Sequence, residues 1–126
     1  MKKIIYTKNA PEPIGPYSQA AAVGPFLFCS GQIPIHAETG EVLQGSVAEQ
    51  AELVMKNIQA VLTANQMDFS HIVKTTIFLT NMSDFAAVNQ VYGKYFTSNF
   101  PARSTVAVAG LPKNVQVEIE VLAHRA

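Results

Sequence analysis

The strongest constraint on the fold is a helical pattern that starts at residue 46. Ser46 and Glu49 have the S-x-x-E spacing of a capping box, in which each side chain satisfies a backbone N–H at the start of a helix. Apolar residues then recur at steps of three and four as far as a helix end near Asn65. They form a single stripe: Val47, Ala51, Val54, Ile58, Val61 and Leu62. A helix with one apolar side must pack against another element of the same chain.

The other periodic segments predict six strands and a second helix. Alternating or β-rich stretches predict strands at residues 4–7, 17–23, 26–33, 72–80, 103–109 and 116–123. A second apolar stripe predicts a helix over residues 83–97, with Ser83 as its N-cap; its members are Phe85, Val88, Tyr92 and Phe96. The order of these elements is typical of an α+β fold, and we expect the last strand to run antiparallel to the strand at 103–109.

Two helices can cover only one face of a six-stranded sheet. The other face is predicted to carry Phe28, Phe78, Ala107 and Leu122 among polar residues. A sheet face this apolar is poorly suited to contact with water, so we expect identical subunits to bury it.

Composition limits the classes of function. The chain has 126 residues, of which 48% are hydrophobic and 14% charged, which predicts a single domain over residues 1–126 with a proper core. Nine basic and nine acidic residues are scattered without runs, which argues against a nucleic-acid or membrane surface. Cys29 is the only cysteine and the three histidines are far apart, so neither a disulfide nor a zinc site is expected. No signal-peptide pattern is apparent, and we expect a cytoplasmic protein.

Arg103 is the first candidate for function. On an alternating strand it shares a face with the small residues Thr105, Ala107 and Ala109, which offer little to bury its charge against. Its planar fork of donors is suited to bidentate capture of a carboxylate or a phosphate. The alternative is a solvated surface arginine, which is the commoner case in proteins.

Further candidates are polar residues on the predicted elements, and each also has a purely structural interpretation. Tyr17 and Glu118 could be ordinary surface groups, Ser30 a strand hydroxyl, and Asn89 a helix-packing amide that needs partners near the core. Gly31, inside a predicted strand, indicates a bulge or a close backbone approach. There is no sequence signature of a catalytic triad, a phosphate-binding loop or a cofactor site.

Five segments of the chain closely resemble the RidA branch of the Rid reactive-intermediate deaminase family. They are IGPYSQ at 14–19, SGQIP at 30–34, VKTT at 73–76, FPARS at 100–104 and VEIE at 117–120. The resemblance covers nearly the whole chain. It implies a chorismate-mutase-like α+β subunit with a mixed sheet, and a homotrimeric barrel with sites between subunits. It also implies hydrolysis of 2-imino acids to 2-keto acids and ammonium, without a cofactor.

The same resemblance implies a role for each candidate residue. Arg103 would bind the substrate carboxylate and Glu118 would orient water. Tyr17, Ser30 and Asn89 would line the substrate, close to the Gly31 backbone. Thr105 stands where many members have cysteine, and its backbone carbonyl would still be available to position water.

Two other functions stay open at this point. The first is a ligand-responsive regulatory protein, in which Arg103 binds a small carboxylate without turnover. The second is RNA cleavage, which the neutral and scattered charge makes the weaker alternative.

Overall fold

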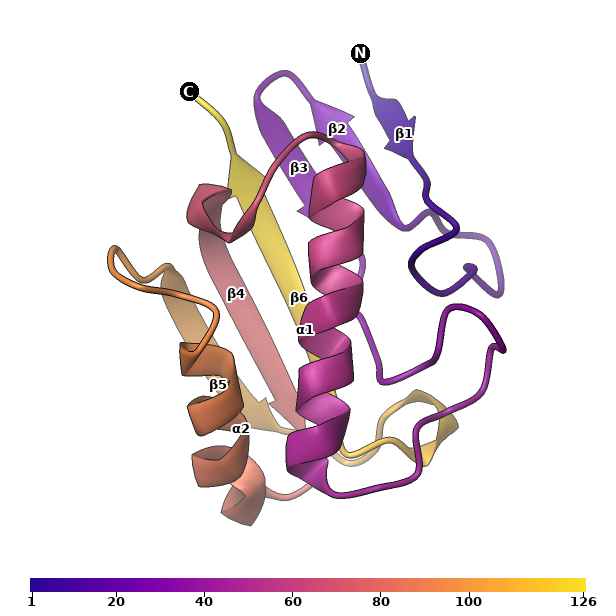
Figure 1. Cartoon of the computed structure of the whole chain (residues 1–126), viewed down its shortest axis with the longest axis vertical. Coiled ribbons are helices and arrows are strands. Elements are labelled where there is room, and N and C mark those ends of the chain that lie inside the picture. The colour runs from indigo at the N-terminus through magenta and orange to yellow at the C-terminus, as the bar shows by residue number, and fades with distance from the viewer.

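Six strands form one sheet in the order β1-β2-β3-β6-β4-β5, and two helices lie against one of its faces (Figure 1). The structure is a computed structural model that describes residues 1–126. Its main elements are β1 (Lys3–Ile5), β2 (Ala20–Val23), β3 (Phe26–Cys29), α1 (Val47–Ala64), β4 (Ile72–Leu79), α2 (Phe85–Gly93), β5 (Ala102–Ala107) and β6 (Val117–His124). The β4–β5 pair is parallel and all other pairs are antiparallel, so the predicted mixed sheet is confirmed.

Helix α1 forms as its sequence pattern predicts. The Ser46 hydroxyl accepts from the Glu49 N–H at 3.1 Å, and the Glu49 carboxylate accepts from the Ser46 N–H at 2.8 Å. Every residue of the predicted apolar stripe is buried. The stripe packs in one core with the inward-facing strand residues, among them Leu27, Ile77 and Ile119. Neither this helix nor α2 is long and apolar enough to cross a membrane.

Buried side-chain amides hold the long loops onto this core. Gln19 donates to the backbone carbonyls of Thr7 and Pro11, and Asn57 on α1 donates to the carbonyl of Ile35. Buried backbone groups outside helices and sheets need such partners, because an unpaired one costs as much as a lost hydrogen bond. The sequence pattern alone did not reveal these contacts.

The second helix is shorter than predicted and starts differently. A 3₁₀ turn at Met82–Asp84 precedes it, and Asn81 is the residue whose side chain caps that turn by accepting from the Ser83 N–H at 2.9 Å. The prediction of Ser83 as the cap was therefore wrong. The capping side chain belongs to Asn81, two residues earlier, and Ser83 supplies the N–H that it accepts from. The helix ends at Gly93, and Phe96 beyond its end is still buried in the core.

Several strand bounds also differ from the prediction, most clearly at β3. Its pairing with β6 stops at Cys29, and a single bridge from Gln32 to Ile119 follows. The three residues 29–31 therefore lie opposite two residues of β6, 120 and 121. The extra residue makes this a bulge. Gly31 was predicted to mark a bulge or a close backbone approach, and the bulge is present; it ends the regular strand before residue 33.

The strand at 103–109 was expected to run antiparallel to the last strand. The two directions are indeed opposed, but β4 lies between them and β5 forms the edge of the sheet. The connection from β4 through α2 to β5 is a crossover, which requires a parallel pair.

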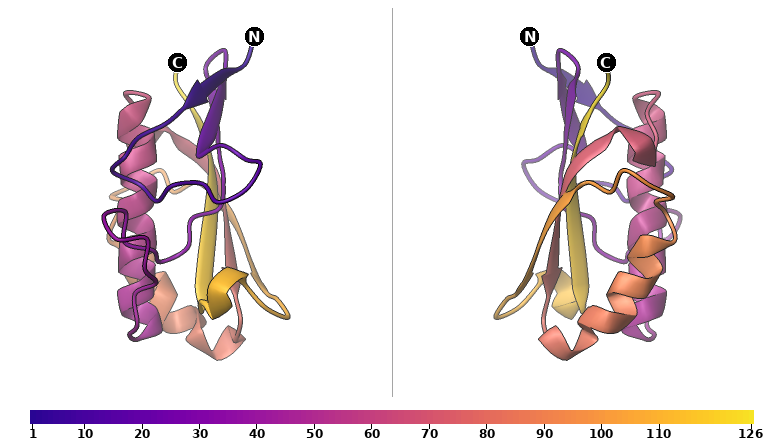
Figure 2. Two further views of the ribbon diagram at one scale, coloured as in Figure 1. Left: turned by 90° about the vertical axis from the view of Figure 1, so that its right-hand side faces the viewer. Right: turned by 90° about the vertical axis from the view of Figure 1, so that its left-hand side faces the viewer.

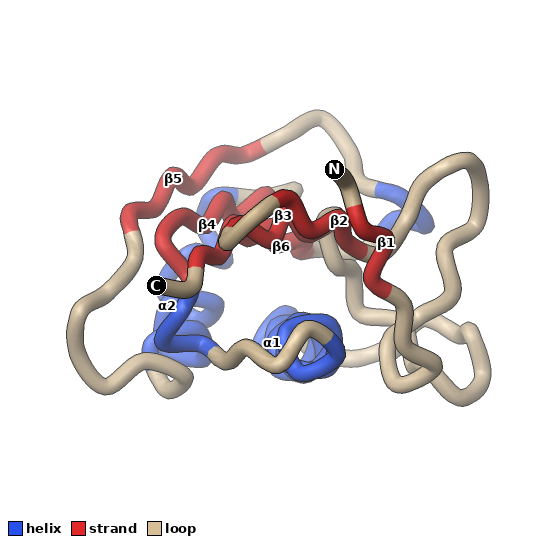
Figure 3. Tube along the Cα trace, turned by 90° about the horizontal axis from the view of Figure 1, so that it is seen from above, coloured by secondary structure: helices blue, strands red, loops and turns tan.

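One face of the sheet carries no helix, as the side views show (Figure 2), and the view along the strands shows both helices beneath the opposite face (Figure 3). Phe28, Phe78 and Leu122 lie on this open face as predicted, and Phe28 is 51% exposed. Placing Ala107 there was wrong. It pairs with Leu79 on the helix side, whereas Val106 pairs with Phe78 on the open face and is 41% exposed.

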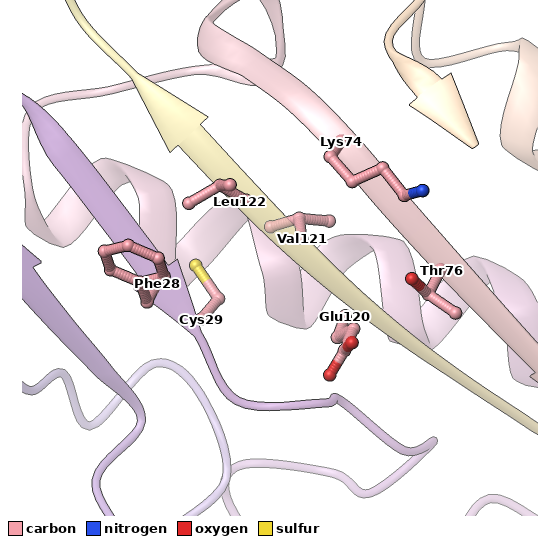
Figure 4. Close-up of a pocket in the computed structure, with 7 residues that line it drawn as sticks. All are labelled: Phe28, Cys29, Lys74, Thr76, Glu120, Val121 and Leu122. Carbon is pink, nitrogen blue, oxygen red and sulfur yellow. The ribbon is translucent and has the colours of Figure 1, made fainter. Parts of the chain in front are cut away.

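The open face is also hollowed at its centre (Figure 4). A depression of about 400 Å³ is lined by Phe28, Cys29, Lys74, Thr76, Glu120, Val121 and Leu122. These residues come from the three neighbouring strands β3, β6 and β4. Apolar and charged side chains thus share a concave sheet surface that no part of the chain covers.

Candidate functional site

The candidate residues divide into two clusters on opposite faces of the sheet. We call Tyr17, Ser30, Gly31 and Glu118 the glutamate cluster, and Arg103, Asn89 and Thr105 the arginine cluster. Glu118 pairs with Phe78 on the open face, whereas Arg103 pairs with Thr75, a buried residue on the helix side. The seven residues therefore do not meet around one cavity within a single chain.

The glutamate cluster is built where the bulge of β3 meets β6. A β-carbon added to Gly31 would overlap the Glu118 carboxylate, so only glycine allows this close approach. Tyr17 and Gly31 line one small cavity of about 110 Å³, and Tyr17 and Ser30 line a neighbouring depression. Ser30 donates from its hydroxyl to the Ser18 carbonyl at 2.6 Å, which fixes its side chain beside the tyrosine segment.

Glu118 has the electrostatics of a proton acceptor rather than of a solvated carboxylate. Partial burial raises the pKa of its carboxyl group, and the nearby charge of Glu120 raises it further. Loss of water disfavours the ionised form and makes the carboxylate more basic when it does form. A carboxylate of this kind is suited to orienting a water molecule and accepting its proton.

The arginine cluster is not the small-residue surface that the sequence predicted. The Arg103 side chain extends from β5 to α2, and its guanidinium lies 5.3 Å from the centre of the Phe85 ring and 5.2 Å from that of Tyr92. Its Nη1 also donates to the Asn89 amide oxygen at 2.6 Å. Asn89 is exposed rather than near the core, and its partner is the arginine.

Phe85 and Tyr92 are the site residues that sequence analysis missed. They were interpreted only as members of the apolar stripe of the second helix. Phe85, Asn89 and Tyr92 are spaced by four and then three residues, so they share one side of α2. This spacing can be read from the sequence. It indicates a site only once the Arg103 side chain is known to reach this side of α2.

No carboxylate neutralises Arg103. The two ion pairs of the chain are His71–Asp68 and Lys94–Glu52, and both lie elsewhere. Aromatic rings and a neutral amide hold the guanidinium, so its full charge remains available to an external anion. The rest of its donor fork makes no hydrogen bond within the chain and can form a bidentate pair.

Thr105 lies two residues beyond Arg103 on the same face of β5. Its hydroxyl oxygen is buried and has no hydrogen-bond partner in the chain. A buried hydroxyl left unpaired costs about 1–3 kcal/mol, so this position favours a bound group or a neighbouring molecule that supplies a partner. No group of three metal-binding side chains occurs anywhere in the structure.

Cys29 is the only cysteine of the chain, and its surroundings do not favour a nucleophile. Its side chain packs against the core, and burial raises the pKa of the thiol to about 12. A thiol protonated at neutral pH is a poor nucleophile. For the imine hydrolysis that the family resemblance implies, we therefore expect Cys29→Ala to keep nearly the parental steady-state rate, measured on the folded protein. Complete loss of activity would make the thiol catalytic.

The fold and the two clusters define a small α+β protein that presents an unneutralised arginine and a half-buried carboxylate on opposite faces of one sheet. Residues 7–125 match the family model described as Endoribonuclease L-PSP. The chain belongs to this family, which is the YjgF/Rid family that the sequence segments resembled.

Named relatives are similar over nearly their whole length. The chain is 54% identical to Protein DfrA of Myxococcus xanthus over 97% of this chain and 95% of the relative. It is 45% identical to the human 2-iminobutanoate/2-iminopropanoate deaminase, over 98% of this chain and 90% of the relative. Among solved structures, Escherichia coli TdcF with bound serine is 43% identical with a TM-score of 0.94, covering 98% and 99% of the two chains.

Proposed function

We propose that this protein is a 2-iminobutanoate/2-iminopropanoate deaminase, which hydrolyses 2-imino acids to 2-keto acids and ammonium. The observation that carries the proposal is an arginine whose charge is held by neutral groups only, which suits a small carboxylate. The human relative carries the name of this activity, and the TdcF structure contains serine, a small amino acid with the same carboxylate.

In the proposed reaction, Arg103 binds the substrate carboxylate and so fixes the position of the imine carbon. Glu118 accepts a proton from water as the water oxygen bonds to that carbon. With the imine nitrogen protonated at the start, this gives a neutral carbinolamine, and Glu118 then returns its proton to the amine nitrogen. The C–N bond breaks as the hydroxyl oxygen forms the keto group, and the released ammonia takes the hydroxyl proton and leaves as ammonium. Imines are already electrophilic, so orientation of the two reactants supplies much of the acceleration.

The proposal requires more than one copy of the chain. Arg103 and Glu118 point to opposite faces, and β4 separates their strands by roughly 10 Å across the sheet. One small substrate can contact both only if the arginine cluster of one copy meets the glutamate cluster of another. We propose a homotrimer whose subunits pack through the open face, with a site at each boundary.

Assembly gives a direct prediction. Sedimentation equilibrium at micromolar concentration is expected to give three times the monomer mass of 13.6 kDa. The apolar open face supplies the driving force, since Phe28, Val106 and Ile4 would leave water. A monomer under these conditions would contradict both the trimer and a shared site.

Turnover is tested by generating the imine enzymatically. An amino-acid oxidase or dehydratase produces 2-iminopropanoate or 2-iminobutanoate in the cuvette, and ammonium and keto acid are followed with and without this protein. We expect release to become faster than spontaneous hydrolysis. Release at the spontaneous rate, with a carboxylate ligand still bound, would instead support the ligand-responsive alternative, for which the serine bound to TdcF is the favouring observation.

A further inference from the structure

The contacts of the Arg103 side chain extend to Tyr92 and, through the Tyr92 hydroxyl, to Thr75. The Tyr92 hydroxyl and the Thr75 hydroxyl are 2.9 Å apart and hydrogen-bonded. Thr75 is also the residue of β4 that pairs with Arg103 in the parallel register. The tyrosine ring beneath the guanidinium is thus tied to the strand beside it, so that β4, α2 and β5 are joined at this point.

The Tyr92 ring has little freedom to move. Tyr92 is only 4% exposed, and its ring also packs against Phe96 with the two centres 4.9 Å apart. Phe85 is the second ring beside the guanidinium, one helical turn before Asn89. The rings and the amide therefore constrain the arginine from α2, while its backbone is fixed on the edge strand.

We propose that Phe85 and Tyr92 are positioning residues, which hold the Arg103 guanidinium in the orientation that accepts the substrate carboxylate. Thr75 supports this arrangement by fixing the Tyr92 ring. The inference rests on the proposed function in that Arg103 is taken as the carboxylate-binding group.

The physical reason is the long side chain of arginine. A free arginine at an edge strand samples many rotamers, and only some of them present the fork to a ligand. Apparent affinity falls in proportion to the fraction of the competent state. A carboxylate in place of the rings would also fix the arginine, but it would neutralise the charge that the ligand needs. Aromatic faces restrict the guanidinium and leave its donors and charge available.

The test compares matched substitutions. Phe85→Leu removes the ring beside the guanidinium, whereas Phe85→Tyr keeps it. Phe69→Leu is the control, because Phe69 is equally half-buried but packs on Tyr95 and Phe96 instead of on Arg103. Tyr92→Phe keeps the ring and removes only the bond to Thr75.

The first readout is binding of 2-oxobutanoate, a stable keto acid that carries the carboxylate, measured by calorimetry on the assembled protein. We expect Phe85→Leu to raise the dissociation constant by about threefold to tenfold, with Phe85→Tyr and Phe69→Leu within twofold of the parent. Tyr92→Phe is expected to weaken binding less than Phe85→Leu does. The second readout is the imine assay, where KM should rise more than kcat falls.

Because binding of a keto acid requires no turnover, the result separates the two ideas. If the variants bind 2-oxobutanoate with the expected order of affinities but the protein hydrolyses no imine, the positioning role stands and the deaminase proposal is wrong. Equal affinity in Phe85→Leu and the parent, both folded and assembled, overturns the positioning role. So does an equal loss in Phe85→Leu and Phe69→Leu, which would show a general effect of the aromatic cluster.

Discussion

Replacing Arg103 by alanine is expected to lower kcat/KM for 2-iminopropanoate by roughly a hundredfold or more. The two charge-assisted hydrogen bonds of a bidentate pair contribute on the order of 1.5–3 kcal/mol each, and about 1.4 kcal/mol corresponds to a factor of ten. Arg103→Lys keeps the charge but loses the planar fork, and we expect at least roughly a tenfold loss from it. Steady-state kinetics on enzymatically generated imine measure both effects.

The other arginine of the chain provides a matched control. Arg125 donates to the Asn65 carbonyl at the end of α1, so its partner differs from the α2 side chains that contact Arg103. Arg125→Lys makes the same chemical change as Arg103→Lys, and it should leave kcat/KM within about twofold. Thermal melts and sedimentation of the Arg103 variants should match the parent, because this side chain is exposed and is proposed to serve binding, not the core. If Arg103→Ala hydrolyses the imine at the parental rate, the carboxylate is bound elsewhere and the site assignment is lost.

Replacing Glu118 by glutamine is expected to lower kcat by about 10²- to 10⁴-fold, the usual contribution of a general base. Glutamine keeps the shape beside Gly31 but accepts no proton from water. The imine should still bind through Arg103, so KM should change much less than kcat. A Glu118→Gln protein with parental kcat would exclude this carboxylate as the base.

The pH dependence follows from the same group. In the proposed reaction Glu118 acts as the carboxylate, so we expect activity to fall as the pH decreases through its pKa, which burial places above the ordinary glutamate value. The charge of Glu120 raises that pKa further. Removing it in Glu120→Gln lowers the pKa of Glu118, so the variant should keep its activity to lower pH than the parent. An unchanged acid limb in an assembled Glu120→Gln protein would mean that another group controls it.

The sequence determined those features that depend on local periodicity and on single-residue chemistry. Helix α1 follows from a capping box and a continuous apolar stripe, both of which are local properties of residues 46–65. The bulge at Gly31 was indicated by a glycine, the residue type without a side chain, inside a strand pattern. Alternation also placed Phe28, Phe78 and Leu122 on the face that the helices leave open.

Tertiary structure decided which of these elements lie side by side, and with them the environment of the site. Alternation placed Arg103 among small residues of its own strand, but in the folded chain its side chain reaches α2, where two aromatic rings lie beside the guanidinium. The opposed faces of Arg103 and Glu118 also depend on how β5 and β6 are both aligned with β4. Strand alignment and helix contact are long-range properties that each segment's own pattern does not encode, because they depend on how the whole core packs.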